Sequence, residues 1–265
     1  MVRRNWKILL FVGALLVAPY VMMAIGESRS PYEIQTSQSY IAPAWKHPFG
    51  TDGLGRDMLA RTLYAAGLSL KVVVQSVAVS FVLALLLGSV AGYTSGHLPD
   101  HLIMWLVSLI YTVPFILIVV AVFAVIQPGL ERSYLVIGCI GWAAPARLVR
   151  AEVMQIRSSP FVLAERAYGF AEARILFRSI LPISFLPALF SLLYYVPELI
   201  GLEVGLSFFG LGAQPPTPSL GRLIYDGLSE FYTGWWLTLI PAVVLLAVMS
   251  CLHFGIQSAR DKKGN

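Results

Sequence analysis

The stretch that decides the fold spans residues 147–182 and has the sequence RLVRAEVMQIRSSPFVLAERAYGFAEARILFRSILP. It is rich in arginine and joins two apolar segments, and we call it the basic segment. Ser159 and Pro160 predict the start of a helix, and Gly169 is suited to end that helix in the left-handed conformation. A second helix should follow and stop before Pro182. Two short helices of this kind indicate a surface on a membrane protein where another protein binds from the cytoplasm.

The composition predicts an all-α, polytopic membrane protein with six transmembrane helices. Of the 265 residues, 57% are hydrophobic and only 12% are charged, whereas soluble domains carry roughly 25% charged residues. Six apolar windows are candidates to cross the ~30 Å hydrocarbon layer. They are Ile8–Ile25, Val72–Tyr93, Leu102–Ile126, Tyr134–Ala146, Ile183–Leu202 and Trp235–Ile256. The fourth window is short and is expected to extend to Val149.

The distribution of lysine and arginine predicts the orientation, because cytoplasmic loops carry an excess of these residues. With the N-terminus inside, twelve of the 19 lie on the cytoplasmic side, six lie outside, and Lys71 starts a span. The cytoplasmic residues are Arg3, Arg4, Lys7, Arg147, Arg150, Arg157, Arg166, Arg174, Arg178, Arg260, Lys262 and Lys263. Both termini are therefore expected in the cytoplasm. Because the basic residues are spread over loops, no nucleic-acid partner is expected.

The first apolar window has two interpretations. Arg3, Arg4 and Lys7 precede it, as in a secretory signal peptide. Its apolar core of 18 residues exceeds the roughly 7–15 residues usual for such peptides. We therefore expect a retained membrane anchor, with a cleaved signal peptide as the alternative.

A polar stretch after the first window is expected to form an outer loop. From Asp57 to Leu70 the pattern becomes helical, with Asp57 and Arg61 four residues apart on one face. Thr51 or Asp52 is expected to cap this helix, which would then begin a turn earlier.

Two carboxylates near the fifth window are candidates for a transport pathway or a subunit contact, because charges in membranes are costly unless they face a cavity or a partner. These are Glu198 and Glu203, whose spacing of five places them on different sides of a helix. Equally, both could be hydrated at the outer surface. His97 and His101 lie four apart without further metal ligands, so neither a metal site nor a cofactor is predicted.

Three motifs resemble the permease subunits of bacterial dipeptide/oligopeptide/nickel ABC importers, specifically the second permease of the pair. HPFGTDGLGRDMLARTLYAAGLSL (residues 47–70) is similar to the amino-terminal signature of that family. FVLAERAYGFAEARILFRSILP (161–182) resembles its EAA loop, and LEVGLSFFGLGAQPPTPSLG (202–221) resembles its late motif. The chain departs from the family at Leu163 and Glu165 of the EAA loop and at Leu220 of the late motif.

The resemblance implies a type I ABC importer permease fold and two regions. Residues 1–67 would hold an anchor helix, an outer loop and an amphipathic segment. Residues 68–265 would form a five-helix core with a cytoplasmic coupling loop at 150–182. The implied ATPase-coupling residues are Ala164, Glu165, Arg166, Ala167, Gly169, Leu181 and Pro182. The implied signature residues are Gly50, Thr51, Asp52, Gly55, Arg56 and Asp57.

The resemblance also implies the partners and the location. The chain would form half of a heterodimeric pore in the bacterial inner membrane, for peptides or a related small solute such as a metal or metal chelate. Its partners would be a second homologous permease, two ATP-binding subunits, an extracytoplasmic substrate-binding protein and the lipid bilayer. The sequence contains no G-x-x-x-x-G-K-[ST] phosphate loop, so the chain is not expected to be an enzyme, and ATP hydrolysis is assigned to the partner subunits.

Two other classes of protein were considered. An ion-coupled secondary transporter needs intramembrane acids and often contains internal repeats. Glu198 and Glu203 are compatible with this class, whereas the missing repeat and the coupling loop argue against it. An intramembrane hydrolase is disfavoured, because His253 lies within a span without an evident catalytic partner.

Overall fold

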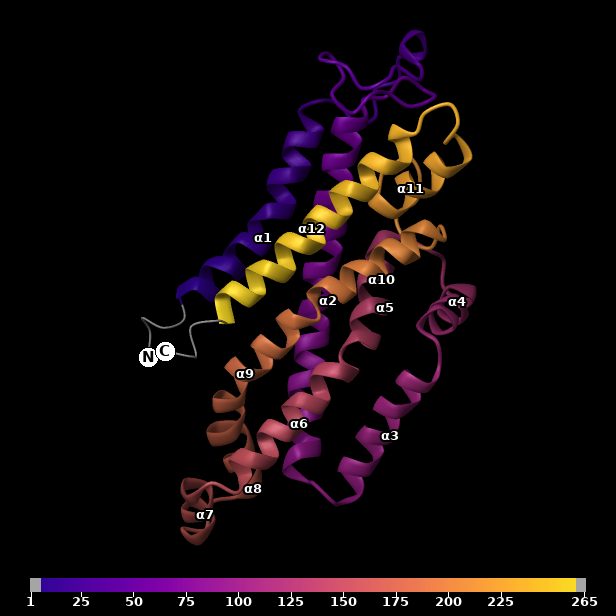
Figure 1. Ribbon diagram of the computed structural model, residues 1–265. Helices are drawn as coiled ribbons and strands as arrows, with labels where there is room; N and C mark the ends of the chain where they lie inside the picture. Colours follow the sequence, from indigo (N-terminus) through magenta and orange to yellow (C-terminus); the bar gives the residue numbers. More distant parts are fainter. Residues whose placement is uncertain (1–5, 261–265) are drawn as a thin grey trace. The chain divides into compact units, whose positions relative to one another are not determined.

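The computed structural model describes residues 6–260, and the regular secondary structure in that range is helical (Figure 1). The α-helices are α1 (Trp6–Glu27), α2 (Met58–Tyr93), α3 (Leu98–Thr112), α4 (Phe115–Val125), α5 (Leu130–Gly141), α6 (Ala143–Arg157), α7 (Pro160–Ala167), α8 (Glu172–Arg174), α9 (Leu181–Tyr194), α10 (Val196–Phe208), α11 (Leu220–Ser229) and α12 (Trp236–Arg260). The predicted all-α class is confirmed. Arg3, Arg4, Lys262 and Lys263, which contributed to the predicted orientation, lie outside the described residues.

Within the described residues, four helical stretches are individually long and apolar enough to cross a membrane. They are Leu10–Glu27, Met58–Tyr93, Glu172–Tyr194 and Trp236–Gln257. A fifth span is obtained if α3 and α4, which meet at an angle of 95°, are taken together. The predicted fourth window is divided between α5 and α6, each of which is shorter than a full span. Six apolar windows in the sequence therefore correspond to a larger number of helices, several of them short.

Proline explains the break in the third apolar window. Pro114 separates α3 from α4, and the preceding residue Val113 has the extended backbone angles φ −88° and ψ 126°. The ring of a proline disfavours the helical conformation of the residue before it. The helix therefore ends at Thr112 and resumes at Phe115 in a new direction.

The described residues form two compact units, with α2 contributing to both. The first unit contains the chain up to Val74, residues 126–134 and the chain from Pro197 onwards. The second contains residues 75–125 and 135–196. The predicted boundary between residues 67 and 68 lies inside the uninterrupted helix α2.

In the first unit, α1 and α12 lie side by side, and α11 packs against the start of α12 (Figure 1). Gly67 of α2 approaches α1 closely, since a Cβ atom at this position would lie 2.5 Å from the carbonyl oxygen of Pro19. The loop between α1 and α2 closes over the end of this unit through Trp236, whose Nε1 donates to the carbonyl oxygen of Thr51 at 3.1 Å.

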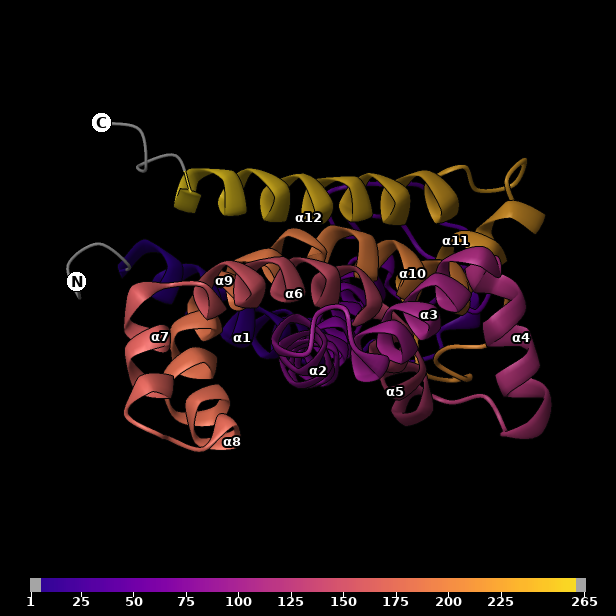
Figure 2. The same cartoon turned by 90° about the horizontal axis from the view of Figure 1, so that it is seen from below.

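In the second unit, α6 packs along α9 and against α3. Its apolar core joins the C-terminal half of α2 to α6, α7 and the turn before α9. The buried members are Leu85, Tyr93, Val149, Val153, Val162, Ile175, Leu176, Ile180 and Ala188. Seen from below, α7 lies beside α8 and the start of α9 (Figure 2). The basic segment is therefore anchored to its unit by its own apolar side chains.

The second predicted helix of the basic segment does not stop before Pro182, which corrects the expectation from the sequence. The chain stays helical from Glu172 to Tyr194, through a π-helical stretch at Ile175–Ile180. Here the N–H of Leu181 donates to the carbonyl oxygen of Leu176, five residues earlier. In the π-helical stretch the backbone hydrogen bonds join residues five apart instead of four, and α9 begins directly after it. Pro182 therefore lies in the first turn of α9, where a proline is tolerated because its missing N–H would have no helical partner.

Candidate functional site

The first half of the basic segment folds as the sequence predicts. Ser159 has an extended backbone, and Pro160 opens α7. After Ala167 the helix ends at Gly169, whose φ of +78° lies in the left-handed region that glycine adopts without strain. The N–H of Phe170 then donates to the carbonyl oxygen of Glu165 at 3.1 Å, which satisfies one of the last helical carbonyls. The predicted start and end of this helix are confirmed.

A polar cluster attaches α7 to the end of α2. The hydroxyl of Tyr93, the last residue of α2, donates to the carboxylate of Glu172. Arg166 donates from Nη2 to the Tyr93 hydroxyl oxygen at 3.2 Å, and its Nε lies 3.2 Å from Oε1 of Glu172. The guanidinium groups of Arg157 and Arg166 lie over the Tyr93 ring, at 5.7 and 5.5 Å from its centroid. We call these four residues the Tyr93 cluster.

Glu165 turns towards its own unit. Its Oε1 accepts a hydrogen bond from Ser179 at 2.8 Å, and its Oε2 is buried without a hydrogen-bond partner among the described residues. Arg166 is used in the Tyr93 cluster. Both charged residues of the predicted coupling set therefore hold the segment together.

The remaining predicted coupling residues lie mostly on the surface. Ala164, Ala167, Gly169 and Pro182 are exposed, and Leu181 is half-buried against the apolar core. Around them lie large apolar side chains that are not among the predicted coupling residues. Phe161, Leu163 and Tyr168 are 42%, 54% and 81% exposed.

Together with Ala164 and Ala167, these three form what we call the α7 apolar surface. In the sequence, this surface is indicated by large apolar residues that occur within the arginine-rich basic segment. Exposed apolar patches on proteins mark interaction sites.

A second polar contact connects α3 to α6. Arg150 donates from Nε and Nη2 to the two carboxylate oxygens of Asp100, at 2.6 and 2.7 Å. Asp100 also accepts from the N–H of Gly96 at 3.0 Å. From the sequence, Arg150 is expected to be a membrane-surface anchor, with a loop acid as the alternative partner, and the structure shows such a partner in Asp100, 50 residues away in the chain.

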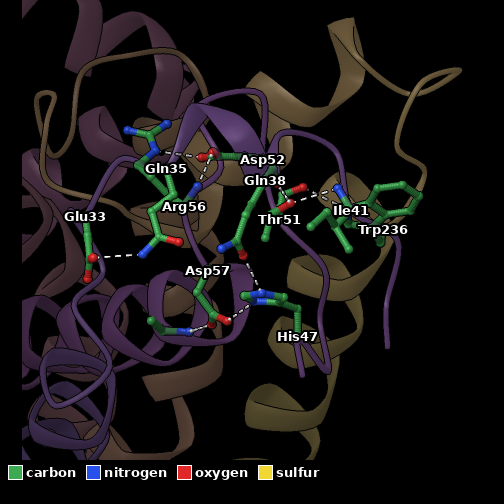
Figure 3. A network of polar contacts seen from close by, with 11 residues as sticks. Glu33, Gln35, Gln38, Ile41, His47, Thr51, Asp52, Arg56, Asp57 and Trp236 are labelled. Carbon is green, nitrogen blue, oxygen red and sulfur yellow. Dashed lines mark hydrogen bonds and ion pairs between the residues drawn. The ribbon is translucent and has the colours of Figure 1, made fainter. Parts of the chain in front are cut away.

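The predicted amino-terminal signature forms a folded network at the start of α2 (Figure 3). Asp52 accepts from the N–H groups of Leu54 and Arg56, at 3.0 and 2.9 Å, and from Nε of Arg56 at 2.7 Å. Thr51 accepts from the N–H of Ile41 at 2.8 Å and donates its hydroxyl to the carbonyl oxygen of Gln38. These bonds fix the outer loop onto the residues that lead into α2.

Asp57, and not Thr51 or Asp52, caps α2, which corrects the predicted start of this helix. Its Oδ1 accepts from the N–H of Ala60 at 2.8 Å, and its Oδ2 lies 3.0 Å from Nδ1 of His47 (Figure 3). Thr51 and Asp52 are instead hydrogen-bonded within the loop, to the backbone of Ile41 and Tyr40 respectively. An N-cap residue needs a non-helical backbone and free N–H groups within reach, and the tertiary contacts leave these only at Asp57.

Two glycines of the signature have positive φ angles, +72° at Gly50 and +71° at Gly55. At Gly55 a Cβ atom would lie 1.8 Å from the carbonyl oxygen of Gln35, so only glycine fits. The signature residues therefore pack and hydrogen-bond the loop between α1 and α2.

Glu198 and Glu203 lie in different environments, as their spacing predicts. Glu198 is exposed in the first turn of α10. Glu203 is 2% exposed, accepts from the hydroxyl of Ser207 at 2.8 Å, and has no hydrogen-bond partner at Oε2 among the described residues. Glu203 is thus a buried carboxyl group in this chain, unlike the hydrated alternative that the sequence left open.

Comparison with known proteins identifies the family. A family model described as the binding-protein-dependent transport system inner membrane component matches residues 84–262. The dipeptide transport system permease protein DppC of Bacillus subtilis is 34% identical over 256 residues, which is 94% of this chain and 80% of the relative. The oligopeptide transport system permease protein OppC of the same organism is 30% identical, with 99% of this chain and 88% of the relative covered.

A solved structure has the same fold. It is the MetNI methionine ABC transporter in an inward-facing conformation, with a TM-score of 0.60 and 20% sequence identity. The match covers 74% of this chain and 93% of the solved chain. Helical fold, apolar spans and sequence similarity agree, and the chain belongs to the family of binding-protein-dependent transport system inner membrane components, as a multi-pass permease of the ABC importer type.

Proposed function

We propose that this chain is one of two homologous permease subunits of an importer that takes up short peptides at the expense of ATP hydrolysed by partner subunits. The peptide substrate is supported by relatives named for dipeptide and oligopeptide transport. The separate ATPase is supported by the sequence, which contains no phosphate-binding loop of the Walker type. An extracytoplasmic binding protein would deliver the peptide, as the family description implies.

The observation that carries this proposal is the construction of the basic segment. It presents the α7 apolar surface outward, while Val162 is buried and the Tyr93 cluster ties the same helix to α2. A partner bound to this surface would push on a helix that is fixed to a long candidate span. Motion of an ATPase would thereby be passed to the membrane helices through α7 and α2.

The roles of individual residues follow from their environment. Ala164 and Ala167 allow close approach of the ATPase, while Glu165 and Arg166 keep α7 in place. Gly169 ends the helix, and Leu181 and Pro182 lead the chain back to α9. We retain residues 1–67 and 68–265 as the proposed anchor and core regions. The basic segment and both termini would face the cytoplasm, and the amino-terminal signature would face outward.

Glu203 would contact the second permease or line the pathway. The burial of its carboxyl group supports this role, because a carboxylate removed from water is costly unless a partner or a cavity compensates it. Glu198, which is exposed, would serve as a contact with a second subunit.

The test of docking is to replace Ala167 by tryptophan in the assembled transporter. The bulky side chain should block the ATPase, so that the ATPase subunits are lost on purification and uptake stops. Ala44→Trp, at an exposed position of the outer loop, is the matched control and should retain the ATPase. Retention of the ATPase and full uptake in Ala167→Trp would show that α7 is not the docking helix.

Energy coupling is tested in vesicles containing the complete transporter. Uptake of a labelled dipeptide should require ATP inside and resist a protonophore. Uptake that is abolished by the protonophore and indifferent to ATP would instead identify an ion-coupled carrier.

A further inference from the structure

The first unit contains a cavity of about 400 Å³ between the outer loop, the first turn of α2 and the helices α11 and α12. This volume lies within the roughly 300–1,000 Å³ typical of small-molecule sites. Its lining combines apolar residues with charged groups of both signs. The residues used below are Tyr40, Asp52, Arg56, Arg61, Asp226 and Glu230.

The walls of the cavity are held by contacts already described. Asp52 is fixed by its bonds to the loop backbone and to Arg56, and Trp236 ties the loop to α12. Leu223 and Leu237 are buried at 5% and 3% exposure and form an apolar part of the lining. The cavity is therefore a preformed feature of the folded loop, as expected for a ligand site.

Arg61 brings an incompletely paired positive charge to this cavity. Its side chain is only 6% exposed, and Nη1 donates to the carbonyl oxygen of Pro31 at 3.1 Å. Among the described residues its Nε has no hydrogen-bond partner, and the Asp52 carboxylate lies 3.5 Å away. That carboxylate is shared with Arg56, which approaches it to 2.7 Å. Asp226 and Tyr32 also stabilise the charge of Arg61, but Asp226 is shared with Arg222 as Asp52 is with Arg56, so a further anionic partner is favourable.

Glu230 brings the opposite charge. It is half-buried, and within the described part of the chain it forms no ion pair with a lysine or arginine. Burial and the nearby Glu230 carboxylate raise the pKa of Tyr40. Asp226, by contrast, is already paired with Arg222 at 2.8 Å. The cavity thus holds one incompletely compensated cation and, in Glu230, a carboxylate whose described partner is the uncharged hydroxyl of Tyr40 instead of a cation.

We propose that this cavity binds a short peptide with free termini, with the peptide carboxylate directed to Arg61 and the peptide ammonium group to Glu230. A solute of one charge alone would leave one of the two groups unmatched, whereas a zwitterion satisfies both. Arginine suits the carboxylate end because its planar guanidinium forms paired hydrogen bonds. The inference rests on the proposed function, and it makes this loop a receiving site for the peptide beside the pore.

The experiment measures equilibrium binding of dialanine to the assembled permease pair and ATPase in nanodiscs, without the binding protein. N-acetyl-dialanine and dialanine amide, each lacking one charge, are the comparison ligands. We expect dialanine to bind at least tenfold more tightly than either blocked form. Glu230→Gln should weaken dialanine binding at least tenfold and remove the discrimination against the acetylated form. Arg61→Lys should chiefly reduce the discrimination against the amide.

Glu33→Gln, which neutralises an exposed carboxylate of the same loop outside the cavity, is the matched control and should bind dialanine like the wild type. Thermal unfolding of the purified complexes verifies that Glu230→Gln is folded. Absence of saturable dialanine binding to the wild type overturns the inference, as does unchanged binding by the folded Glu230→Gln complex.

The two proposals fail differently. ATP-driven uptake without a dialanine site at Glu230 leaves the importer function intact and removes the receiving site. Dialanine binding that depends on Glu230, in a complex that takes up no peptide with ATP, removes the importer function instead.

Discussion

At the scale of single residues, Tyr93 has an unusual number of roles. Its hydroxyl donates to Glu172 and accepts from Arg166, and its ring lies under two guanidinium groups. A hydrogen bond to a charged group contributes roughly 1.5–3 kcal/mol. Tyr93 is therefore the residue through which we expect α7 to act on α2.

Replacing Tyr93 by phenylalanine should keep the ring and remove both hydrogen bonds. Because the side chains of Glu172 and Arg166 are 60% and 29% exposed, solvent screens these bonds and we expect a net loss of about 1 kcal/mol. ATP-driven uptake should therefore fall roughly three- to tenfold. The measurement is initial uptake in vesicles, normalised to the amount of assembled transporter. Tyr232→Phe, at a fully exposed tyrosine, should leave uptake unchanged. Equal uptake by Tyr93→Phe and wild type would contradict this role.

The pair of Asp100 and Arg150 should contribute to stability. The Asp100 side chain is 5% exposed and that of Arg150 is 28% exposed. Removing one partner of a buried pair is strongly destabilising, whereas an exposed pair contributes about 0–1 kcal/mol. We expect Asp100→Asn to lower stability by about 2 kcal/mol, less than for a fully buried pair because Arg150 is partly hydrated.

Asp226→Asn breaks a more exposed arginine pair, with side chains 33% and 49% exposed, and is the control. The midpoint of thermal unfolding in detergent should fall clearly for Asp100→Asn and little for Asp226→Asn. Raising the salt concentration should remove most of the small Asp226 effect. Equal shifts for both variants would mean that burial does not decide the strength of these pairs.

At the scale of elements, α2 runs from the loop that follows α1 to Tyr93, which contacts Arg166 of α7. Its 36 residues give a length of about 54 Å, well beyond the ~30 Å of the hydrocarbon layer. In the second unit, two glycines one helical turn apart let α2 approach α6. A Cβ atom would lie 2.7 Å from the carbonyl oxygen of Ala146 at Gly88, and 2.5 Å from that of Arg150 at Gly92. Small residues spaced by four allow such close packing in membranes.

Gly92→Val should separate the two helices. The added side chain would clash with backbone atoms of α6, which cannot move aside as the end of a flexible side chain can. Overpacking of this kind lowers the free energy of unfolding by about 1–3 kcal/mol. Gly13→Val in α1 is the control, because nothing lies within 4 Å of its Cβ position. We expect a lower midpoint of thermal unfolding and reduced uptake for Gly92→Val only. A similar loss in both variants would assign the effect to helix propensity instead of packing.

At the scale of the whole molecule, the proposed orientation makes a labelling prediction. Cys139 and Cys251 are exposed free thiols and must first be replaced by serine. A cysteine introduced at exposed Glu33 should then react with a membrane-impermeant thiol reagent in intact cells. One introduced at Tyr168, which is 81% exposed, should react only in inverted vesicles. Labelling at position 168 from outside intact cells would invert the proposed topology.

The helical class, the apolar spans and the ends of α7 could all be predicted from local sequence. The composition and the apolar windows predict the class and the spans. Ser159, Pro160 and Gly169 predict the ends of α7, because a helix end depends on residues within a few positions of it. The break at Pro114 also has a local cause, but it lies inside a continuous apolar window, which predicted a single uninterrupted span. The continuation of helix past Pro182 was missed, because it depends on a change in the bonding pattern over the preceding residues.

The sequence by itself determined that this chain is an α-helical membrane protein with the motifs of a permease, and it predicts that the basic segment binds another protein. Hydrophobicity, charge distribution and motifs are properties of the chain read in order, so folding was not needed to recognise them. The tertiary structure decided which charges are used internally. Glu172 meets Tyr93 from 79 residues away, Arg150 meets Asp100, and Asp52 serves Arg56 and Arg61 while Asp57 caps α2. Such pairings depend on distances across the fold, and those distances are set by how the apolar faces pack.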